Sequence, residues 1–314
     1  MKILITGVHG FVGSNLVEAL KKEHSIYGLD IVSPFKEGVR FTFSWDFMDK
    51  PGEIPDVDAI IHLAGKAHDT KNQAAADVYF KVNTELTKKI FEWFLAQPKC
   101  KKFVFFSTAK AAADKVDGIL TEDVVPAPIG PYGESKIAAE RYLLSKMDDV
   151  RSKDKGVYIF RPCMIHGPGN KGNLNLLYNV VKEGIPWPLG AFENRRTFTS
   201  IGNICFAVEG VLTKDVPSGI YNMGDDDALS TNELIEEICN SLGKKAHIWK
   251  LPKGLMNGVA KIGGWLHLPL NPERLRKLTE SYVSSNAKIK NALGVDKMPV
   301  DARTGLKVTL ESFK

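Results

Sequence analysis

A hydroxyl, a phenol and a primary amine occur along the chain in an arrangement that suits proton transfer. Thr108 lies at the end of the apolar run 101–109, and Tyr132 and Lys136 open an alanine-rich stretch that follows a loop rich in proline and glycine. Residues four apart share one face of a helix, so the phenol and the ammonium can lie side by side. A nearby positive charge favours the phenolate and lowers the pKa of a tyrosine below its usual value of about 10.

The three side chains have separable roles in a reaction between an alcohol and a carbonyl. Tyr132 would be the acid or base, Lys136 would tune its pKa, and Thr108 would hold the substrate oxygen. The plainer alternatives are a helix start with two solvated polar groups and a strand-end hydroxyl that binds backbone. For such a reaction, the rest of the chain must therefore bind a cofactor that gives or takes a hydride.

Glycines follow the first apolar run at a regular spacing. Residues 2–8 are expected to form a buried strand and residues 11–22 have the apolar period of a helix, with Gly7, Gly10 and Gly13 around the turn between them. Such a turn lets the backbone approach a pyrophosphate, which the free N–H groups and the dipole of the helix N-terminus attract. The segment predicts a dinucleotide site.

Asp30 ends the second expected strand, residues 25–30. A carboxylate in this place can accept hydrogen bonds from the hydroxyls of an adenosine ribose and would repel a 2′-phosphate. Since no arginine follows immediately, NAD is favoured over NADP. The alternative is that Asp30 only caps a turn.

Strands and helices alternate through the first half of the chain. Apolar strand patterns at 57–65, 101–109 and 156–162 are separated by helical patterns, including one at 77–97. This order predicts an α/β fold with a doubly wound parallel sheet, a Rossmann domain. Ligands of such sheets bind at the carboxyl ends of the strands. The following residues all fall at those ends: Gly7, Asp30, Ala64, Gly65, Ser107, Thr108, Arg161 and Pro162.

The alternation weakens after residue 167. We expect residues 1–167 to form the dinucleotide-binding domain, with a segment near 197–225 that returns to it. Residues 168–314 would then be mainly a smaller, mixed α/β substrate-binding domain.

Composition excludes several classes of function. The net charge is +5 with no basic block, so nucleic acid is not an expected partner. The four cysteines are widely spaced and form no cluster with histidine, so no metal site or disulfide framework is indicated. No apolar run is long enough for a membrane span, and no cleavable apolar segment precedes the first strand. We expect a cytoplasmic protein, since free thiols suit a reducing compartment.

Several short motifs occur in one order along nearly the whole chain: "TGVHGFVG" (6–13), "HLAG" (62–65), "ST" (107–108), "YGESK" (132–136) and "RPCMIHGPG" (161–169). In these motifs the sequence resembles an extended short-chain dehydrogenase/reductase of the NAD-dependent nucleotide-sugar epimerase/dehydratase family, and its UDP-glucose 4-epimerase-like subgroup in particular. The resemblance implies an enzyme that binds NAD and a nucleotide-diphosphate sugar, with a UDP-sugar expected. It also implies a possible homodimer.

The resemblance and the residue chemistry together assign three sets of positions. The catalytic set is Thr108, Tyr132 and Lys136. The cofactor set is Gly7, His9, Gly10, Phe11, Val12, Gly13, Asp30, Asp46, Phe47, Leu63, Ala64, Gly65, Asn83, Ser107, Tyr132, Lys136 and Pro162. The substrate set is Lys66, Thr108, Lys110, Met164, Asn173, Arg196 and Arg274. Arg196 suits a diphosphate because guanidinium groups make charge-assisted, bidentate bonds, and Arg276 competes with Arg274 for the same role.

Three reactions of the family compete. A 4,6-dehydratase needs an Asp-Glu pair directly after the threonine, but Thr108 is followed by Ala109 and Lys110, so dehydration is disfavoured. A 4-epimerase is the preferred interpretation, and a reductase of 4-keto sugar nucleotides in surface polysaccharide synthesis is the alternative. Met164 stands where many sugar-nucleotide epimerases have asparagine, which leaves the sugar undetermined. A non-catalytic NAD-binding regulator is disfavoured because Tyr132 and Lys136 are both present.

Overall fold

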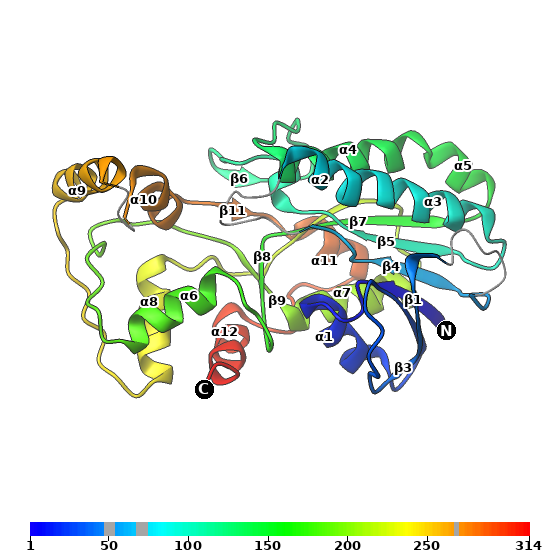
Figure 1. The fold of residues 1–314 in the computed structure, drawn as a ribbon, viewed down its shortest axis with the longest axis horizontal. Helices are drawn as coiled ribbons and strands as arrows, with labels where there is room; N and C mark the ends of the chain where they lie inside the picture. Colours follow the sequence, from blue (N-terminus) through cyan, green and yellow to red (C-terminus); the bar gives the residue numbers. More distant parts are fainter. Residues whose placement is uncertain (47–53, 67–74, 267–269) are drawn as a thin grey trace.

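A seven-stranded parallel sheet forms the centre of the larger part of the molecule (Figure 1). The computed structural model describes residues 1–46, 54–66, 75–266 and 270–314. The strand order is β3-β2-β1-β4-β5-β7-β10, and these strands are β1 (Lys2–Thr6), β2 (Ser25–Leu29), β3 (Val39–Phe43), β4 (Ala59–His62), β5 (Lys102–Phe106), β7 (Gly156–Pro162) and β10 (Gly219–Met223). Because all seven are parallel, their carboxyl ends meet at one edge.

Side chains alternate between the two faces of this sheet, and each face carries its own core. Ile3 and Ile5 of β1 pack with one set of helices, which is α1 (Phe11–Leu20), α7 (Ile201–Thr213) and α11 (Ala287–Leu293). Leu4 between them packs with the opposite set, which is α3 (Leu86–Ala96), α4 (Pro131–Ser145) and α5 (Met147–Ser152). Helices therefore cover both faces, and the predicted doubly wound Rossmann-like fold is confirmed.

Short elements precede α3 and α4. The chain enters α3 through α2 (Ala76–Tyr79) and a π-helical segment, η2 (Phe80–Glu85). Between β5 and α4 lie a 3₁₀ turn, η3 (Ala109–Ala111), and β6 (Ile119–Leu120). These connections lie at the carboxyl edge of the sheet, where the candidate residues are.

The second half of the chain builds a further core beside the sheet (Figure 1). It packs α6 (Asn173–Lys182), α8 (Thr231–Ser241), α9 (Lys253–Trp265), α10 (Pro272–Thr279) and α12 (Ala302–Glu311). Two small parallel sheets accompany it: β8 (Met164–His166) pairs with β9 (Phe198–Ser200), and β6 pairs with β11 (Val283–Ser284). The chain returns to the large sheet at α7, β10 and α11, so the two parts are joined by several crossings.

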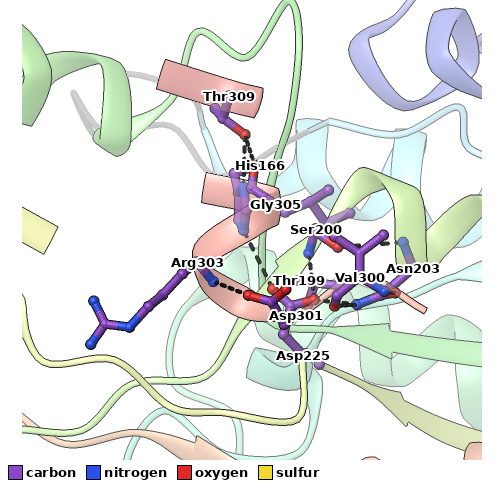
Figure 2. Close-up of polar contacts among 12 residues, drawn as sticks. His166, Thr199, Ser200, Asn203, Asp225, Val300, Asp301, Arg303, Gly305 and Thr309 are labelled. Carbon is purple, nitrogen blue, oxygen red and sulfur yellow. Dashed lines mark hydrogen bonds and ion pairs between the residues drawn. The ribbon is translucent and has the colours of Figure 1, made fainter. Parts of the chain in front are cut away.

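A buried polar cluster lies where these crossings meet (Figure 2). His166 at the end of β8 binds Thr309 of α12 (2.9 Å) and lies 3.5 Å from the carboxylate of Asp225, which follows β10. The other oxygen of Asp225 accepts from Asn203 of α7 (2.7 Å). Asn203 also binds the backbone of Val300 on both its N–H and its carbonyl, so α7 and the entry to α12 are held together.

Within the described segments, none of the helices combines the length and the apolarity that a membrane span requires.

Candidate active site

Thr108 and Tyr132 meet at the carboxyl edge of the sheet. Thr108 lies two residues after the end of β5 and caps η3, and Tyr132 lies in the first turn of α4, after a proline at the helix start. The Thr108 hydroxyl and the Tyr132 phenol are joined by a hydrogen bond. The predicted pair of acid–base group and orienting hydroxyl is therefore assembled in space.

The environment of Tyr132 acts on its pKa in opposite directions. Burial raises the pKa of the phenol above its ordinary value because it disfavours the phenolate, while the hydrogen bond from Thr108 lowers it. Tyr79 packs edge-on against the ring with centroids 6.4 Å apart. The phenol is thus held in one orientation and is protonated in the protein alone.

Lys136 lies one helical turn after Tyr132 and is buried. Its Nζ donates to the carbonyl of Phe106 at the end of β5 (2.8 Å) and lies 4.9 Å from the centre of the Phe105 ring. Burial lowers the pKa of Lys136 to about 8, and the nearby Glu140 carboxylate opposes this shift. The ammonium is therefore a buried group with a perturbed pKa, as functional residues often are.

Glu140 completes a buried network that the sequence analysis did not identify. Its carboxylate pairs with Arg161 of β7, with Nη2 to Oε2 at 2.5 Å and Nε at 3.1 Å from both oxygens. Ser107 also donates to Glu140, so this hydroxyl is engaged with α4. The network fixes α4 against β5 and β7. A signal was present: Glu140 follows Lys136 by four residues and so lies on the same helix face.

Asn83 ties the loop after β4 to α4. Its side chain accepts from the N–H of Lys66 (2.7 Å), donates to the carbonyl of Lys66 (3.2 Å) and donates to Ser135 of α4 (3.0 Å). A methyl group built on Gly65 would lie 2.9 Å from Asn83 Oδ1 and 3.2 Å from Lys136 Nζ. Only glycine fits this close approach, so the loop, Asn83 and the lysine form one packed unit.

The same loop is anchored on β1 by a buried histidine. His62 binds Thr6 (2.7 Å) and Thr87 of α3 (2.9 Å), and the Thr6 hydroxyl in turn accepts from the N–H of Ala64 (3.0 Å) and of Leu63 (3.2 Å). Burial lowers the pKa of His62 to about 3, with a smaller effect of Lys136 in the same direction. The histidine is therefore neutral and has a positioning role.

The glycine turn fits a pyrophosphate. Gly7 has φ of +72°, which favours glycine, and a methyl group on Gly13 would lie 2.4 Å from the carbonyl oxygen of Gly7. The N-cap residue Gly10 offers α1 no side-chain hydrogen bond, and the first turn holds no acidic residue. The first N–H groups of α1 are thus left for an anion, as in dinucleotide sites.

Asp30 holds the turn from the end of β2. Its carboxylate accepts from the N–H of His9 (3.0 Å) and from that of Ile31 (2.7 Å). The His9 ring lies 3.3 Å from the hydroxyl of Thr42 on β3. The turn-capping alternative for Asp30 is therefore realised, and a carboxylate oxygen has further lone pairs for a ribose hydroxyl.

A cluster of charges lies beside Thr108. Lys110 Nζ binds Asp114 at 2.8 Å, and Arg276 of α10 approaches the same carboxylate at 3.6 Å. The pKa of Asp114 is lowered, although burial opposes this, because it binds Lys110 and lies near Arg276. The cluster connects the rim of the candidate site to α10. Of the two candidate arginines on α10, Arg276 is the one that approaches Asp114 at this rim.

Arg196 lies on the other side of this rim. It is half-buried, its pKa is lowered by burial, and its Nη1 donates to the carbonyl of Lys277 at 2.5 Å. Its backbone pairs with Leu229 and lies beside Tyr282. Cys163, which follows β7, is close enough to act electrostatically on the guanidinium. Arg196 thus reaches from the strand edge to the end of α10.

The remaining predicted residues lie on several other elements and differ in exposure. Pro162 ends β7, Met164 opens β8 and packs against the smaller core, and Phe11 and Val12 open α1. Asp46 and Asn173 are exposed, at the end of the segment after β3 and at the start of α6. Arg274 is exposed on α10. Phe47 lies outside the described residues.

The chain is similar to proteins of one family along most of its length. The sequence profile described as the NAD dependent epimerase/dehydratase family matches residues 3–224. A UDP-glucose 4-epimerase of Vibrio cholerae is 31% identical over 267 residues, which cover 80% of this chain and 78% of that protein. An N-acetyl-alpha-D-glucosaminyl-diphospho-ditrans,octacis-undecaprenol 4-epimerase of Escherichia coli O157:H7 is 26% identical over 92% of this chain and 84% of its own.

A solved structure has the same fold. The Thermus thermophilus UDP-glucose 4-epimerase in complex with NAD superposes with a TM-score of 0.75 at 24% identity, over 100% of this chain and 99% of that one. With the matched profile, the Vibrio relative and the strand-turn-helix geometry in agreement, the chain belongs to the NAD dependent epimerase/dehydratase family.

Proposed function

We propose that this NAD-dependent enzyme is a 4-epimerase of a sugar carried on a diphosphate, with UDP-hexoses and UDP-N-acetylhexosamines as the first candidates. The observation that carries the proposal is the Thr108–Tyr132 hydrogen bond, with the buried Lys136 one turn further along α4. This arrangement suits the removal of a hydrogen from a secondary alcohol and its return.

The residues divide the proton chemistry among them. Bound NAD supplies the hydride acceptor and donor. Tyr132, as the phenolate, takes the proton of the C4 hydroxyl, and Thr108 holds the same oxygen by its hydroxyl. Lys136 supplies a buried positive charge that favours the phenolate. After the 4-keto sugar turns over, Tyr132 returns the proton to the oxygen on the new face.

The residues after Thr108 support epimerisation over dehydration. Elimination of water needs an acid and a base beside the sugar ring, and η3 places Ala109 and Lys110 there. The carboxylate of Asp114 has a lowered pKa and is bound by Lys110. Neither η3 nor Asp114 therefore supplies the acid and base that elimination of water across C5 and C6 requires.

The diphosphate is proposed to lie between the two parts of the chain. Lys110 and Arg276 both approach Asp114, and Arg196 donates to the carbonyl of Lys277 near the end of α10. Guanidinium groups in such places favour a diphosphate by charge-assisted bonds. Both named relatives act on a hexose joined to a diphosphate, one as a nucleotide sugar and one as a polyprenol-linked sugar. We therefore infer that residues 168–314 mainly form the substrate-binding part.

The test is a product assay without net redox change. The purified protein is incubated with UDP-glucose, UDP-galactose and their N-acetyl forms, with and without added NADH, and the sugars are separated by chromatography. Interconversion of the C4 epimers without loss of NADH supports the proposal. Stoichiometric NADH loss with a 4-keto sugar nucleotide, and no interconversion, would overturn it.

That second outcome would support the alternative, a 4-keto sugar nucleotide reductase. The same catalytic residues would serve both reactions. Met164 at the start of β8 is the observation that favours retaining the reductase as a second candidate. Methionine offers no strong hydrogen bond to a substrate, whereas the asparagine typical of many epimerases does. A different set of sugar contacts is therefore expected at this position.

A further inference from the structure

Helix α9 exposes a continuous apolar face. Leu255, Val259, Ile262 and Leu266 follow one another at intervals of four, three and four residues, and Trp265 adjoins them; we call these five residues the α9 apolar face. Leu255 is 54% exposed, Ile262 58% and Trp265 80%. Single exposed apolar residues are ordinary, but a stripe of this length on one helix marks an interaction surface.

The opposite side of α9 already has its partner. Met256, Ala260 and Gly263 are buried in the core of the smaller part. The exposed stripe therefore lies on the side of α9 that faces away from this core. Helix α9 also packs beside α10, where a methyl group on Gly264 would lie 3.1 Å from Pro272. In Figure 1 these two helices lie at the outer end of the molecule, away from the large sheet.

Positive charges surround this surface. The sequence from residue 238 to 272 has no aspartate or glutamate and contains five lysines. Lys253 and Lys261 lie on α9 itself and Lys250 lies just before it; all three are exposed. Trp249, 54% exposed, adds a second indole to the same segment. The segment thus combines an apolar stripe, exposed tryptophans and lysines, while acidic residues begin again only at Glu273.

We propose that the α9 apolar face docks on an anionic phospholipid bilayer, with α9 lying in the plane of the interface. An amphipathic helix with lysines beside a stripe of leucine, isoleucine and tryptophan is the pattern of a surface-bound helix, whose apolar face enters the boundary between headgroups and acyl chains. Tryptophan prefers this boundary, and lysines near it gain from anionic headgroups. The described helices are unsuited to spanning, so the contact is peripheral.

The charges argue for a bilayer over a second copy of the chain. Two copies joined through α9 would bring Lys253 and Lys261 near their counterparts, with no acidic residue on the helix to compensate. Like charges across an apolar seam oppose pairing. An anionic lipid surface complements the same lysines. The inference is independent of the reaction, since it uses none of the proposed catalytic or substrate residues.

Vesicle binding tests the proposal. The full chain is mixed at low salt with vesicles of phosphatidylcholine alone or with about 30% phosphatidylglycerol, and the bound fraction is measured by co-sedimentation. We expect binding to the anionic vesicles that weakens as salt is raised. The triple variant Leu255→Ser, Ile262→Ser, Trp265→Ser should bind these vesicles about tenfold more weakly or worse. It removes most of the apolar area that would enter the bilayer.

Two further variants make the result specific. Leu176→Ser with Val308→Ser removes exposed apolar residues from α6 and α12 and should leave vesicle binding unchanged. Lys253→Glu with Lys261→Glu should abolish the preference for anionic lipid. Circular dichroism and NAD binding show that each variant is folded. Absence of wild-type binding, or equal binding by the triple variant, would overturn the proposal. So would a concentration-dependent dimer of the wild type that the triple variant fails to form.

Discussion

The phenolic oxygen of Tyr132 can be removed without disturbing the packing of its ring. Since Tyr132→Phe keeps the edge-on contact of the ring with Tyr79, the variant should fold and bind NAD as the wild type does. The proton acceptor is lost, so kcat should fall by about 10³-fold, within the range typical of general acid–base groups. Steady-state kinetics and a titration with NAD measure the two effects. A variant that kept full turnover would remove Tyr132 from the mechanism.

Thr108 offers a matched pair of substitutions. Thr108→Ser keeps the hydroxyl that bonds Tyr132, whereas Thr108→Val keeps the shape of the side chain and removes the hydroxyl. We expect kcat to change little in the first and to fall by about 10–100-fold in the second, because the lost hydrogen bond orients the substrate oxygen and favours the phenolate. Equal kcat values for both variants would assign Thr108 a packing role only.

Lys136 should leave a mark on stability as well as on activity. Its folded-state pKa of about 8 lies below the ordinary value of 10.5, so between these values the unfolded chain binds the extra proton. The cost of burying the charge is therefore fully present below about pH 8 and declines as the pH rises to 10.5. Relative to Lys136→Met, the wild type should gain up to about 3 kcal/mol across this interval. Urea unfolding of both proteins at pH 7, 8, 9 and 10 measures the difference, and a constant difference would contradict it.

At this scale, the candidate catalytic residues could be proposed from the sequence more readily than the residues that hold them in place. Tyr132 and Lys136 are four apart on one helix, so their proximity could be predicted. The Ser107–Glu140–Arg161 network joins β5, α4 and β7, and its partners are set by how the helix docks on the sheet. Such docking depends on contacts far apart in the chain, which a local pattern does not contain.

At the scale of elements, the glycine turn is the feature on which cofactor binding depends. A methyl group at position 13 would lie 2.4 Å from the Gly7 carbonyl and 2.9 Å from Val8, all backbone contacts that cannot move cheaply. Gly13→Ala should therefore lose about 2–3 kcal/mol of stability and bind NAD at least tenfold more weakly. Thermal unfolding and NAD titration provide the two readouts.

The matched control is Gly258→Ala on α9, where a methyl group meets nothing within 4 Å. Because alanine is the better helix former, this variant should gain about 0.5–1 kcal/mol and keep wild-type NAD affinity. If Gly13→Ala behaved like this control, the close approach in the turn would be irrelevant to the cofactor.

The segment around Asn83 shows where element prediction stops. The apolar period predicts one helix over 77–97, and the structure has helix there, but as α2, the π-helical η2 and α3. A π-helical turn carries one residue more than an α-turn and rotates the side chains that follow. Asn83 hydrogen-bonds to Lys66 and Ser135, which both lie outside this helical stretch. No pattern within 77–97 could therefore predict the π-helical segment that places Asn83 between them.

At the scale of the whole molecule, the order of β–α units predicted the doubly wound sheet, because parallel strands need helical crossovers of one hand. The return of α11 to the sheet was not predicted. Its residues Ile289 and Leu293 pack beside α7 and β10, although α8, α9 and α10 of the smaller core lie between them in sequence. A seven-residue helix carries too few apolar positions for its partner to be recognised from sequence alone.

The polar junction of Figure 2 gives the last prediction. Asn203 binds Asp225 (2.7 Å) and both backbone groups of Val300 (2.7 and 3.0 Å), which couples α7 of the large sheet to the entry of α12. Asn203→Leu keeps the volume but removes all three hydrogen bonds from a largely buried junction, so it should cost about 3 kcal/mol. Thr213→Val, on the exposed end of the same helix, should cost far less.

The way in which Asn203→Leu unfolds should also change. Its contacts join segments from both parts of the chain, so weakening them lowers the coupling between the two cores as well as their stability. Trp45 and Trp93 pack against the core of the large sheet, whereas Trp187 lies in the smaller core. All proteins in this experiment therefore carry Trp45→Phe and Trp93→Phe, so that fluorescence reports on the smaller part while circular dichroism reports on both. We expect the two unfolding curves to coincide in the wild type and in Thr213→Val, and to separate in Asn203→Leu. Coincident curves for all three proteins would show that the junction adds stability without coupling the two parts.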